Sequence, residues 1–191
     1  MKYVNSISTF THEVKQSKFI AHLLPYSDYE STLKILKEQH PKARHFVTAF
    51  RYLNEFRQIV EHSSDDGEPK GTSGKPSLMV LQGEELIETA VITIRYFGGT
   101  KLGTGGLVRA YSDAVNLVIN EAELIEYKQE IVSTISMEYS DVRFINYECE
   151  AFEVDIVNKI FDSNVIYKIK ASKENMKEFL EKVQRVVKTK E

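Results

Sequence analysis

All nine glycines of this 191-residue chain lie between Gly67 and Gly106, and most of them fall in two short motifs. The first motif, residues 65–76, reads DDGEPKGTSGKP, and the second motif, residues 95–109, reads RYFGGTKLGTGGLVR. Glycine permits sharp bends and the close approach of another group to the backbone. Because basic and hydroxyl side chains accompany the glycines, we expect ligand contacts from Asp65, Asp66, Glu68, Lys70, Gly71, Thr72, Ser73, Gly74, Lys75, Arg95, Gly98, Gly99, Lys101, Gly103, Thr104, Gly105, Gly106 and Arg109.

Neither motif is a standard nucleotide-binding loop. A Walker A motif would need a glycine at Pro69 and a serine or threonine at Pro76, and the dinucleotide fingerprint would need a small residue at Val108. A looser anion site remains, because 103–106 lead into an expected helix whose first N–H groups favour negative charge. In the alternative reading, these glycines only allow a tight turn and close packing.

The acidic residues of the first motif have two readings. Asp65, Asp66 and Glu68 can bind a divalent ion or act as acid and base, or Asp66 and Gly67 form a turn and the other two are solvated. The five histidines lack metal-ligand spacing, and no nucleophile motif is present. We therefore assign no catalytic residue, metal or cofactor, and leave open whether the protein is an enzyme.

Two aromatic residues, Tyr96 and Phe97, end the expected strand beside the glycines of the second motif. They can stack on a base, although aromatic residues at a strand end more often close a core. His45 lies in an expected strand, where we interpret it as structural.

Composition limits the class of protein. The net charge of −3 argues against a basic coat, so nucleic-acid binding would need a local basic patch. No apolar run reaches the roughly 18–20 residues that span a bilayer. The single cysteine, Cys149, cannot form an internal disulfide, and the first residues lack a secretory pattern, so we expect a cytoplasmic protein. No feature of the sequence indicates an oligomeric state.

The apolar, β-branched run 90–94 predicts a central strand that leads into the second motif. Ser27 and Glu30 have the spacing of a capping box, which predicts a helix that ends near Pro41. Apolar periodicity predicts a long helix from Gly106 to about residue 122. The other elements expected in the amino half are strands over 11–16, 18–24, 44–53 and 56–61 and a short helix over 77–82.

Polar residues 127–130 predict a linker between two domains, 1–128 and 129–191. The second domain is expected to follow the order β-α-β-β-α, which is a split-βαβ, ferredoxin-like unit without its last strand. Ser172 is the expected cap of the final helix, and Cys149 is expected in the core. The fold class is therefore α+β.

Both motifs resemble the signature of the YigZ/IMPACT family, and residues 17–19 and His45 also fit its pattern. The resemblance implies an amino domain similar to domain IV of elongation factor G, a ribosomal-protein-like sheet with helices on one face. It implies a carboxyl domain similar to domain V of the same factor. Ser73 stands where alanine is usual in the family.

The resemblance implies a role in translation, because eukaryotic members restrain a starvation-responsive kinase through a protein contact. For bacterial members it implies binding to RNA or the ribosome, and it carries over no catalytic residue. Three hypotheses follow: a translation-associated protein that contacts RNA, the ribosome or a translation regulator through both motifs; an enzyme acting on a phosphorylated small molecule; and a protein-interaction module with structural glycines.

Overall fold

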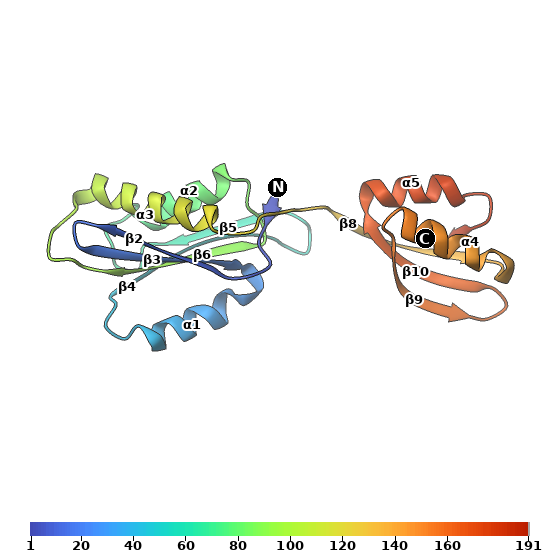
Figure 1. Cartoon of the computed structure of the whole chain (residues 1–191), viewed down its shortest axis with the longest axis horizontal. Helices are drawn as coiled ribbons and strands as arrows, with labels where there is room; N and C mark the ends of the chain where they lie inside the picture. Colours follow the sequence, from blue (N-terminus) through green and yellow to red (C-terminus); the bar gives the residue numbers. More distant parts are fainter. Residues whose placement is uncertain (191) are drawn as a thin grey trace. The chain divides into compact units, whose positions relative to one another are not determined.

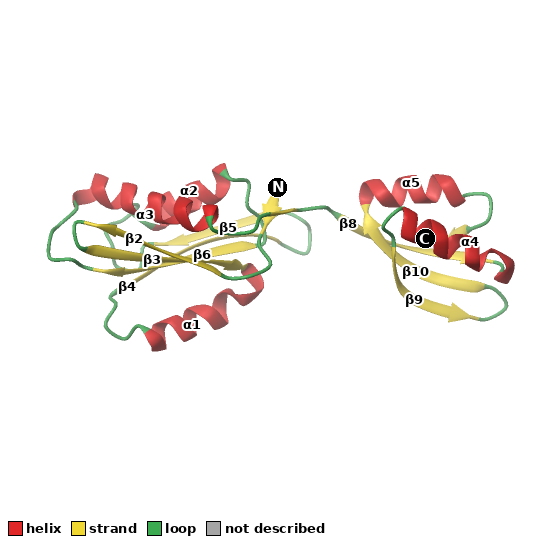
Figure 2. Ribbon diagram, viewed as in Figure 1, coloured by secondary structure: helices red, strands yellow, loops and turns green. Residues whose placement is uncertain are grey.

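The computed structural model describes residues 1–190 and contains two compact units, the amino unit Met1–Tyr127 and the carboxyl unit from Lys128 onward (Figure 1). Both units combine helices with antiparallel sheet (Figure 2).

The amino unit is built on a five-stranded antiparallel sheet with the order β2-β3-β6-β4-β5. Its strands are β2 (Ser8–Val14), β3 (Ser17–Pro25), β4 (His45–Leu53), β5 (Ile59–Ser64) and β6 (Thr89–Tyr96). The prediction of a central strand from the β-branched run is confirmed by β6, which lies in the middle of this sheet. The short strands β1 (Lys2–Tyr3) and β7 (Ile125–Glu126) pair separately.

Helices cover both faces of this sheet, so the expectation of helices on one face is wrong (Figure 2). The helices α2 (Gly74–Gly83) and α3 (Gly103–Asn120) lie on one face, and α1 (Tyr29–Gln39) lies on the other. On β6, Val91 packs in the core beneath α2 and α3, whereas Ile92 and Ile94 share a second cluster with Leu36 of α1. Successive residues of β6 are buried, so both faces of the strand are covered, and this requires a helix on each face of the sheet.

Several helix starts differ from the sequence predictions. The prediction of a capping box is wrong. Asp28 precedes α1 without a side-chain cap, and the Ser27 hydroxyl donates to the Asp28 carboxylate instead. A 3₁₀ turn over Tyr26–Asp28 takes up the residues where the cap was expected. Helix α3 begins at Gly103, three residues before the expected Gly106, and α2 begins at Gly74 rather than at residue 77.

The topology brings both glycine motifs to the same end of the amino-unit sheet. Strands β5 and β6 both run antiparallel to β4, so they point in the same direction and end at the same side. The first motif follows β5 directly, and the second begins with the last two residues of β6. The β2–β3 turn and the connection from α1 to β4 reach the same side. We call this side the motif end; it comprises loops 15–16, 40–44, 65–73 and 97–102 with the first turns of α2 and α3, and it lies at the left of Figure 1.

The carboxyl unit has a four-stranded antiparallel sheet with the order β11-β8-β10-β9. Its elements are β8 (Glu130–Met137), a 3₁₀ turn (Tyr139–Asp141), α4 (Val142–Ala151), β9 (Asp155–Phe161), β10 (Val165–Ser172), α5 (Lys173–Val183) and β11 (Lys188–Lys190). The expectation that the last strand is missing is wrong, because β11 pairs with β8 at the sheet edge. Its sequence is Lys-Thr-Lys, and a short polar edge strand of this kind carries no apolar signal.

Two smaller predictions for the carboxyl unit are confirmed. The Ser172 hydroxyl accepts a hydrogen bond from the Asn175 N–H and caps α5. Cys149 is buried among apolar residues, and this burial raises the pKa of its thiol to about 11. The protonated thiol therefore behaves as a small core side chain.

Candidate functional site

The loop of the first motif is organised around the carboxylate of Asp65. Its Oδ1 accepts hydrogen bonds from the Ser73 hydroxyl at 2.7 Å, the Gly74 N–H at 2.8 Å and the Ser73 N–H at 3.1 Å. Its Oδ2 accepts from the Gly71 N–H at 2.7 Å. The carboxylate therefore closes the loop and caps the start of α2, which satisfies N–H groups that a helix leaves unpaired.

These bonds favour the charged form of Asp65. Burial by itself raises the pKa of this carboxyl, but the hydrogen bonds from Gly71, Ser73 and Gly74 outweigh it and lower the pKa below the ordinary value of 3.8. An internal carboxylate already lies where an external anion would bind at the α2 N-terminus. We conclude that Asp65 acts on the loop rather than on a ligand.

We expect Asp65→Asn to lower the free energy of unfolding of the amino unit by about 2 kcal/mol at pH 7, because an amide cannot accept all four bonds. Since the folded pKa lies below the unfolded one, the stabilisation is present above about pH 4 and is lost as the pH falls through the folded pKa. The difference in the free energy of unfolding between variant and parent should therefore shrink below pH 4. Urea unfolding between pH 3 and pH 7 measures it, with the exposed Asp28→Asn as control; a gap that does not change with pH contradicts the prediction.

The turn expected at Asp66 and Gly67 is confirmed. The Glu68 N–H donates to the Asp65 carbonyl at 3.0 Å, and Asp66 and Gly67 have φ values of 43° and 85°. The turn is fastened to the start of β4, because Asp66 Oδ2 accepts from the Phe46 N–H at 2.6 Å and the Asp66 carbonyl accepts from His45 Nδ1 at 2.9 Å. The hydrogen bond of His45 to this turn supports the interpretation of His45 as a structural residue.

A buried ion pair joins the two motifs. Glu68 of the first motif and Arg95 of the second are 8% and 7% exposed, so Glu68 is not solvated as one of the sequence readings assumed. Arg95 donates from one terminal nitrogen to Glu68 Oε1 at 2.7 Å and to Oε2 at 3.0 Å, and the Tyr111 hydroxyl of α3 donates to Oε1 at 2.8 Å. Burial, followed by the nearby Glu68 carboxylate, raises the pKa of Tyr111 and keeps its hydroxyl protonated.

Two glycines are required by close approach of backbone. A Cβ at Gly98 would lie 2.0 Å from the Gln16 carbonyl carbon in the β2–β3 turn, and a Cβ at Gly74 would lie 2.7 Å from Ser64. By contrast, a Cβ would meet nothing within 4 Å at Gly71, Gly99, Gly103 or Gly105. The motifs therefore contain both packing glycines and glycines that face open space.

The remaining candidates divide into buried and exposed groups. The Thr72 and Ser73 side chains are buried, and the Thr72 hydroxyl donates to the Pro69 carbonyl at 2.6 Å. The candidates whose side chains remain exposed are Asp66, Lys70, Lys75, Lys101, Thr104 and Arg109. All of them lie in the loops or early turns of the motif end.

Sequence reasoning missed three exposed basic residues that the fold adds to the motif end: Lys15, Lys42 and Arg44. They lie in the β2–β3 turn and in the loop before β4, far from both motifs in the sequence. Only the strand order, which brings β3 and β4 beside β6, indicates that these loops share an end.

The acidic residues do not form a metal-binding arrangement. Within residues 1–190 no group of three histidine, cysteine, aspartate or glutamate side chains could hold a metal ion. The oxygens of Asp65 and Glu68 are engaged by protein donors, so the geometry does not favour them as a catalytic acid and base. Over the same residues 1–190, no helix is long and apolar enough to cross a membrane.

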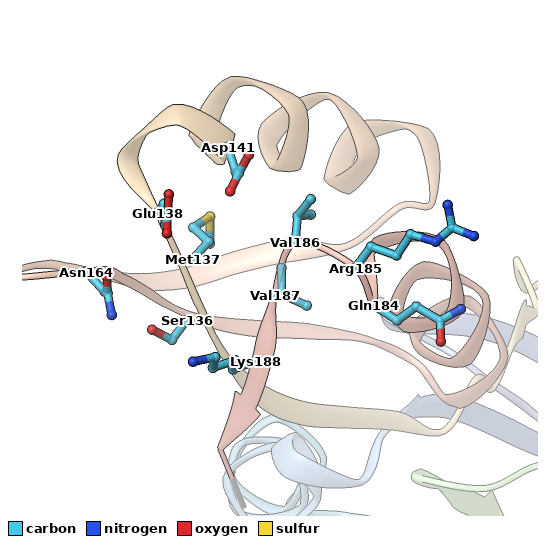
Figure 3. A pocket seen from close by; sticks show the side chains of 10 residues that line it. All are labelled: Ser136, Met137, Glu138, Asp141, Asn164, Gln184, Arg185, Val186, Val187 and Lys188. Atoms are coloured by element: carbon cyan, nitrogen blue, oxygen red, sulfur yellow. The ribbon is translucent and has the colours of Figure 1, made fainter.

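The carboxyl unit carries a separate cavity of about 480 Å³ near the ends of β8 and α5 (Figure 3). Figure 3 shows the carboxylates of Glu138 and Asp141 at one side and the Arg185 guanidinium at the other. The residues that line it are Ser136, Met137, Glu138, Asp141, Asn164, Gln184, Arg185, Val186, Val187 and Lys188. Its charged groups do not converge on one point, and all of its lining residues belong to the carboxyl unit.

These features define an α+β protein in which two glycine motifs are joined by a buried ion pair at one end of a sheet. The chain belongs to the IMPACT family: residues 15–119 match the Impact N-terminal domain, which confirms the resemblance seen in the motifs. It is 36% identical over 166 residues to an IMPACT family member of Haemophilus influenzae, covering 84% of this chain and 79% of that protein. It is 31% identical over 180 residues to the family member YigZ of Escherichia coli, covering 92% of this chain and 87% of that protein. A crystal structure of a hypothetical protein matches with a TM-score of 0.68 and 26% identity over 98% of this chain and 95% of the other.

Proposed function

We propose that this protein binds RNA of the translation apparatus through the motif end of its amino unit. The observation that carries the proposal is the gathering of seven exposed basic side chains at this end in a chain of net charge −3: Lys15, Lys42, Arg44, Lys70, Lys75, Lys101 and Arg109. Such a local cluster attracts the phosphate backbone even when the whole protein is slightly acidic.

Of the carboxylates at this end, Glu68 is neutralised by Arg95, and the negative charges of Asp65 and Asp66 are outnumbered by the seven exposed basic side chains. Asp65 and Glu68 are held by internal donors, and Asp66 accepts from the Phe46 N–H. The start of α3 differs from that of α2, because no side chain of the described residues caps it. Its first N–H groups and the open surface at Gly105 therefore remain accessible to a phosphate.

The translation part of the proposal comes from the family resemblance, which links relatives to translation. Residues Lys101 and Arg109 flank the uncapped start of α3, so we assign them phosphate contacts. The exposed lysines of loop 65–73 and of the first turn of α2 extend the same surface.

We expect Lys101→Glu/Arg109→Glu to weaken binding to ribosomal RNA by about tenfold or more, because two phosphate contacts become repulsive. The parent's binding should also weaken steeply with salt. Filter binding of the full chain at several salt concentrations measures both effects. Lys34→Glu/Lys177→Glu is the matched control, since it changes the charge equally at exposed positions in α1 and α5.

Equal losses in both double variants, or binding that does not respond to salt, would contradict the proposal. Recovery of a protein partner that survives both nuclease treatment and Lys101→Glu/Arg109→Glu would favour the interaction module instead.

A further inference from the structure

A second cavity, of about 390 Å³, lies at the motif end and is lined by Lys42, Arg44, His45, Arg95, Tyr96 and Phe97. Four of these six residues carry basic side chains, and none is acidic. Its volume falls within the range of small-ligand sites. Only Arg95 belongs to the candidate residues that the motifs define.

The strand register builds the floor of this cavity. His45 of β4 and Arg95 of β6 are direct neighbours across the sheet, so their side chains leave the same face. His45 donates from Nδ1 to the Asp66 carbonyl, which leaves Nε2 for another partner. Lys42 and Arg44 are exposed in the loop just before β4 and supply the positive charge.

Arg95 has a buried hydrogen-bonding group that the protein does not use. Its charge is balanced by Glu68, but its Nε is buried without a hydrogen-bond partner in the described part of the chain. A buried donor without an acceptor destabilises the free protein, and a ligand oxygen would remove that cost. The Phe97 ring lies over the guanidinium, with 5.7 Å between the ring centroid and Cζ, so it stands beside this donor.

Phe97 also presents a free aromatic surface. Its side chain is 59% exposed, although an aromatic residue at a strand end usually closes the core. Tyr96, its neighbour, is instead partly buried in the cluster beneath α1, and its hydroxyl lies 2.9 Å from His40 Nδ1. An exposed ring beside a cationic cavity is the arrangement that binds a base and its phosphate together.

We infer that this cavity is a nucleotide subsite in which Lys42 and Arg44 hold a phosphate group and Phe97 stacks on the base. The inference deepens the proposed function and rests on it, since the nucleotide would be one unit of the bound RNA. Arg95 contributes a buried donor to a ligand oxygen, while its pairing with Glu68 holds it in position.

Titration of the full chain with adenosine 5′-monophosphate, followed by amide NMR shifts of residues 42–45 and 95–97, tests the subsite. Lys42→Glu/Arg44→Glu should weaken binding at least about tenfold, and the control Lys34→Glu/Lys177→Glu, at exposed positions outside the motif end, should leave it unchanged. Phe97→Ala should weaken the binding of adenosine 5′-monophosphate at least about fivefold and leave the binding of inorganic phosphate unaffected.

The subsite is overturned if adenosine 5′-monophosphate does not shift these amides, or if Lys42→Glu/Arg44→Glu binds it normally. Preference for a phosphoserine peptide over the nucleotide also overturns it. If the nucleotide titration fails but ribosomal RNA still binds, the subsite is wrong and the proposed function stands. Absence of RNA binding overturns the proposed function whatever the nucleotide titration gives.

Discussion

Replacing Glu68 by alanine should lower the free energy of unfolding of the amino unit by about 3–5 kcal/mol. Arg95 is only 7% exposed, and the substitution leaves its guanidinium without a counter-charge. It also removes the acceptor of the Tyr111 hydroxyl. A buried charge without a partner costs far more than the pair itself contributes. The loss should therefore be among the largest that any single polar substitution causes in this chain.

Urea unfolding followed by NMR measures the effect, because amide signals of the amino and carboxyl units can be read separately. Glu13→Ala is the control: Glu13 pairs with Lys18 at 3.2 Å, but both side chains are more than half exposed, so we expect a loss below about 1 kcal/mol. Glu68→Gln should fall between the two, since it keeps an acceptor for Tyr111. A Glu68→Ala loss no greater than that of Glu13→Ala would contradict the structural role of the pair.

This ion pair shows why part of the site could not be predicted from sequence. Glu68 and Arg95 are 27 residues apart, and nothing in either motif indicates that they meet. Their contact follows from the common direction of β5 and β6, which depends on the pairing of both strands with β4. The acidic residues of the first motif were therefore open to metal-binding, catalytic or solvated readings, whereas Asp65 and Glu68 hold the loops in place.

Features that depend on residues close together in the sequence were easier to predict than this long-range contact. The β-branched run predicted β6, the Asp66-Gly67 turn formed, and Ser172 caps α5, because each depends on neighbouring residues. The run of successive apolar residues 90–92 also contained a sign of helices on both faces, since a strand with one wet face alternates polar and apolar residues. The start of α2 at Gly74 depends on the hydrogen bond that its N–H donates to Asp65, which lies nine residues earlier in the chain, so no capping rule could place it.

The glycines of the second motif should give opposite results when each is replaced by alanine. At Gly98 the new Cβ would lie 2.0 Å from the Gln16 carbonyl carbon and 2.3 Å from the Ser17 nitrogen, so the β2–β3 turn must move. That movement also strains the hydrogen bond from the Gly98 N–H to the Ser17 hydroxyl. We expect Gly98→Ala to lower the free energy of unfolding by about 3 kcal/mol.

Gly105→Ala is the matched control, because it removes a glycine from the same motif where a Cβ meets nothing within 4 Å. Alanine favours a helix more than glycine does, so this change in α3 should raise the stability by about 0.5–1 kcal/mol. Urea unfolding of both variants gives the two signs, and losses of equal size would contradict the division into packing and open glycines.

The same pair of variants separates architecture from binding. A methyl group at residue 105 would stand at the open first turn of α3, where we propose that a phosphate approaches the backbone. A Gly105→Ala protein that is more stable yet binds ribosomal RNA several-fold more weakly would assign the open glycines to ligand contact. Unchanged RNA binding would instead restrict the role of residue 105 to the fold, and the exposed basic side chains alone would then have to account for the affinity.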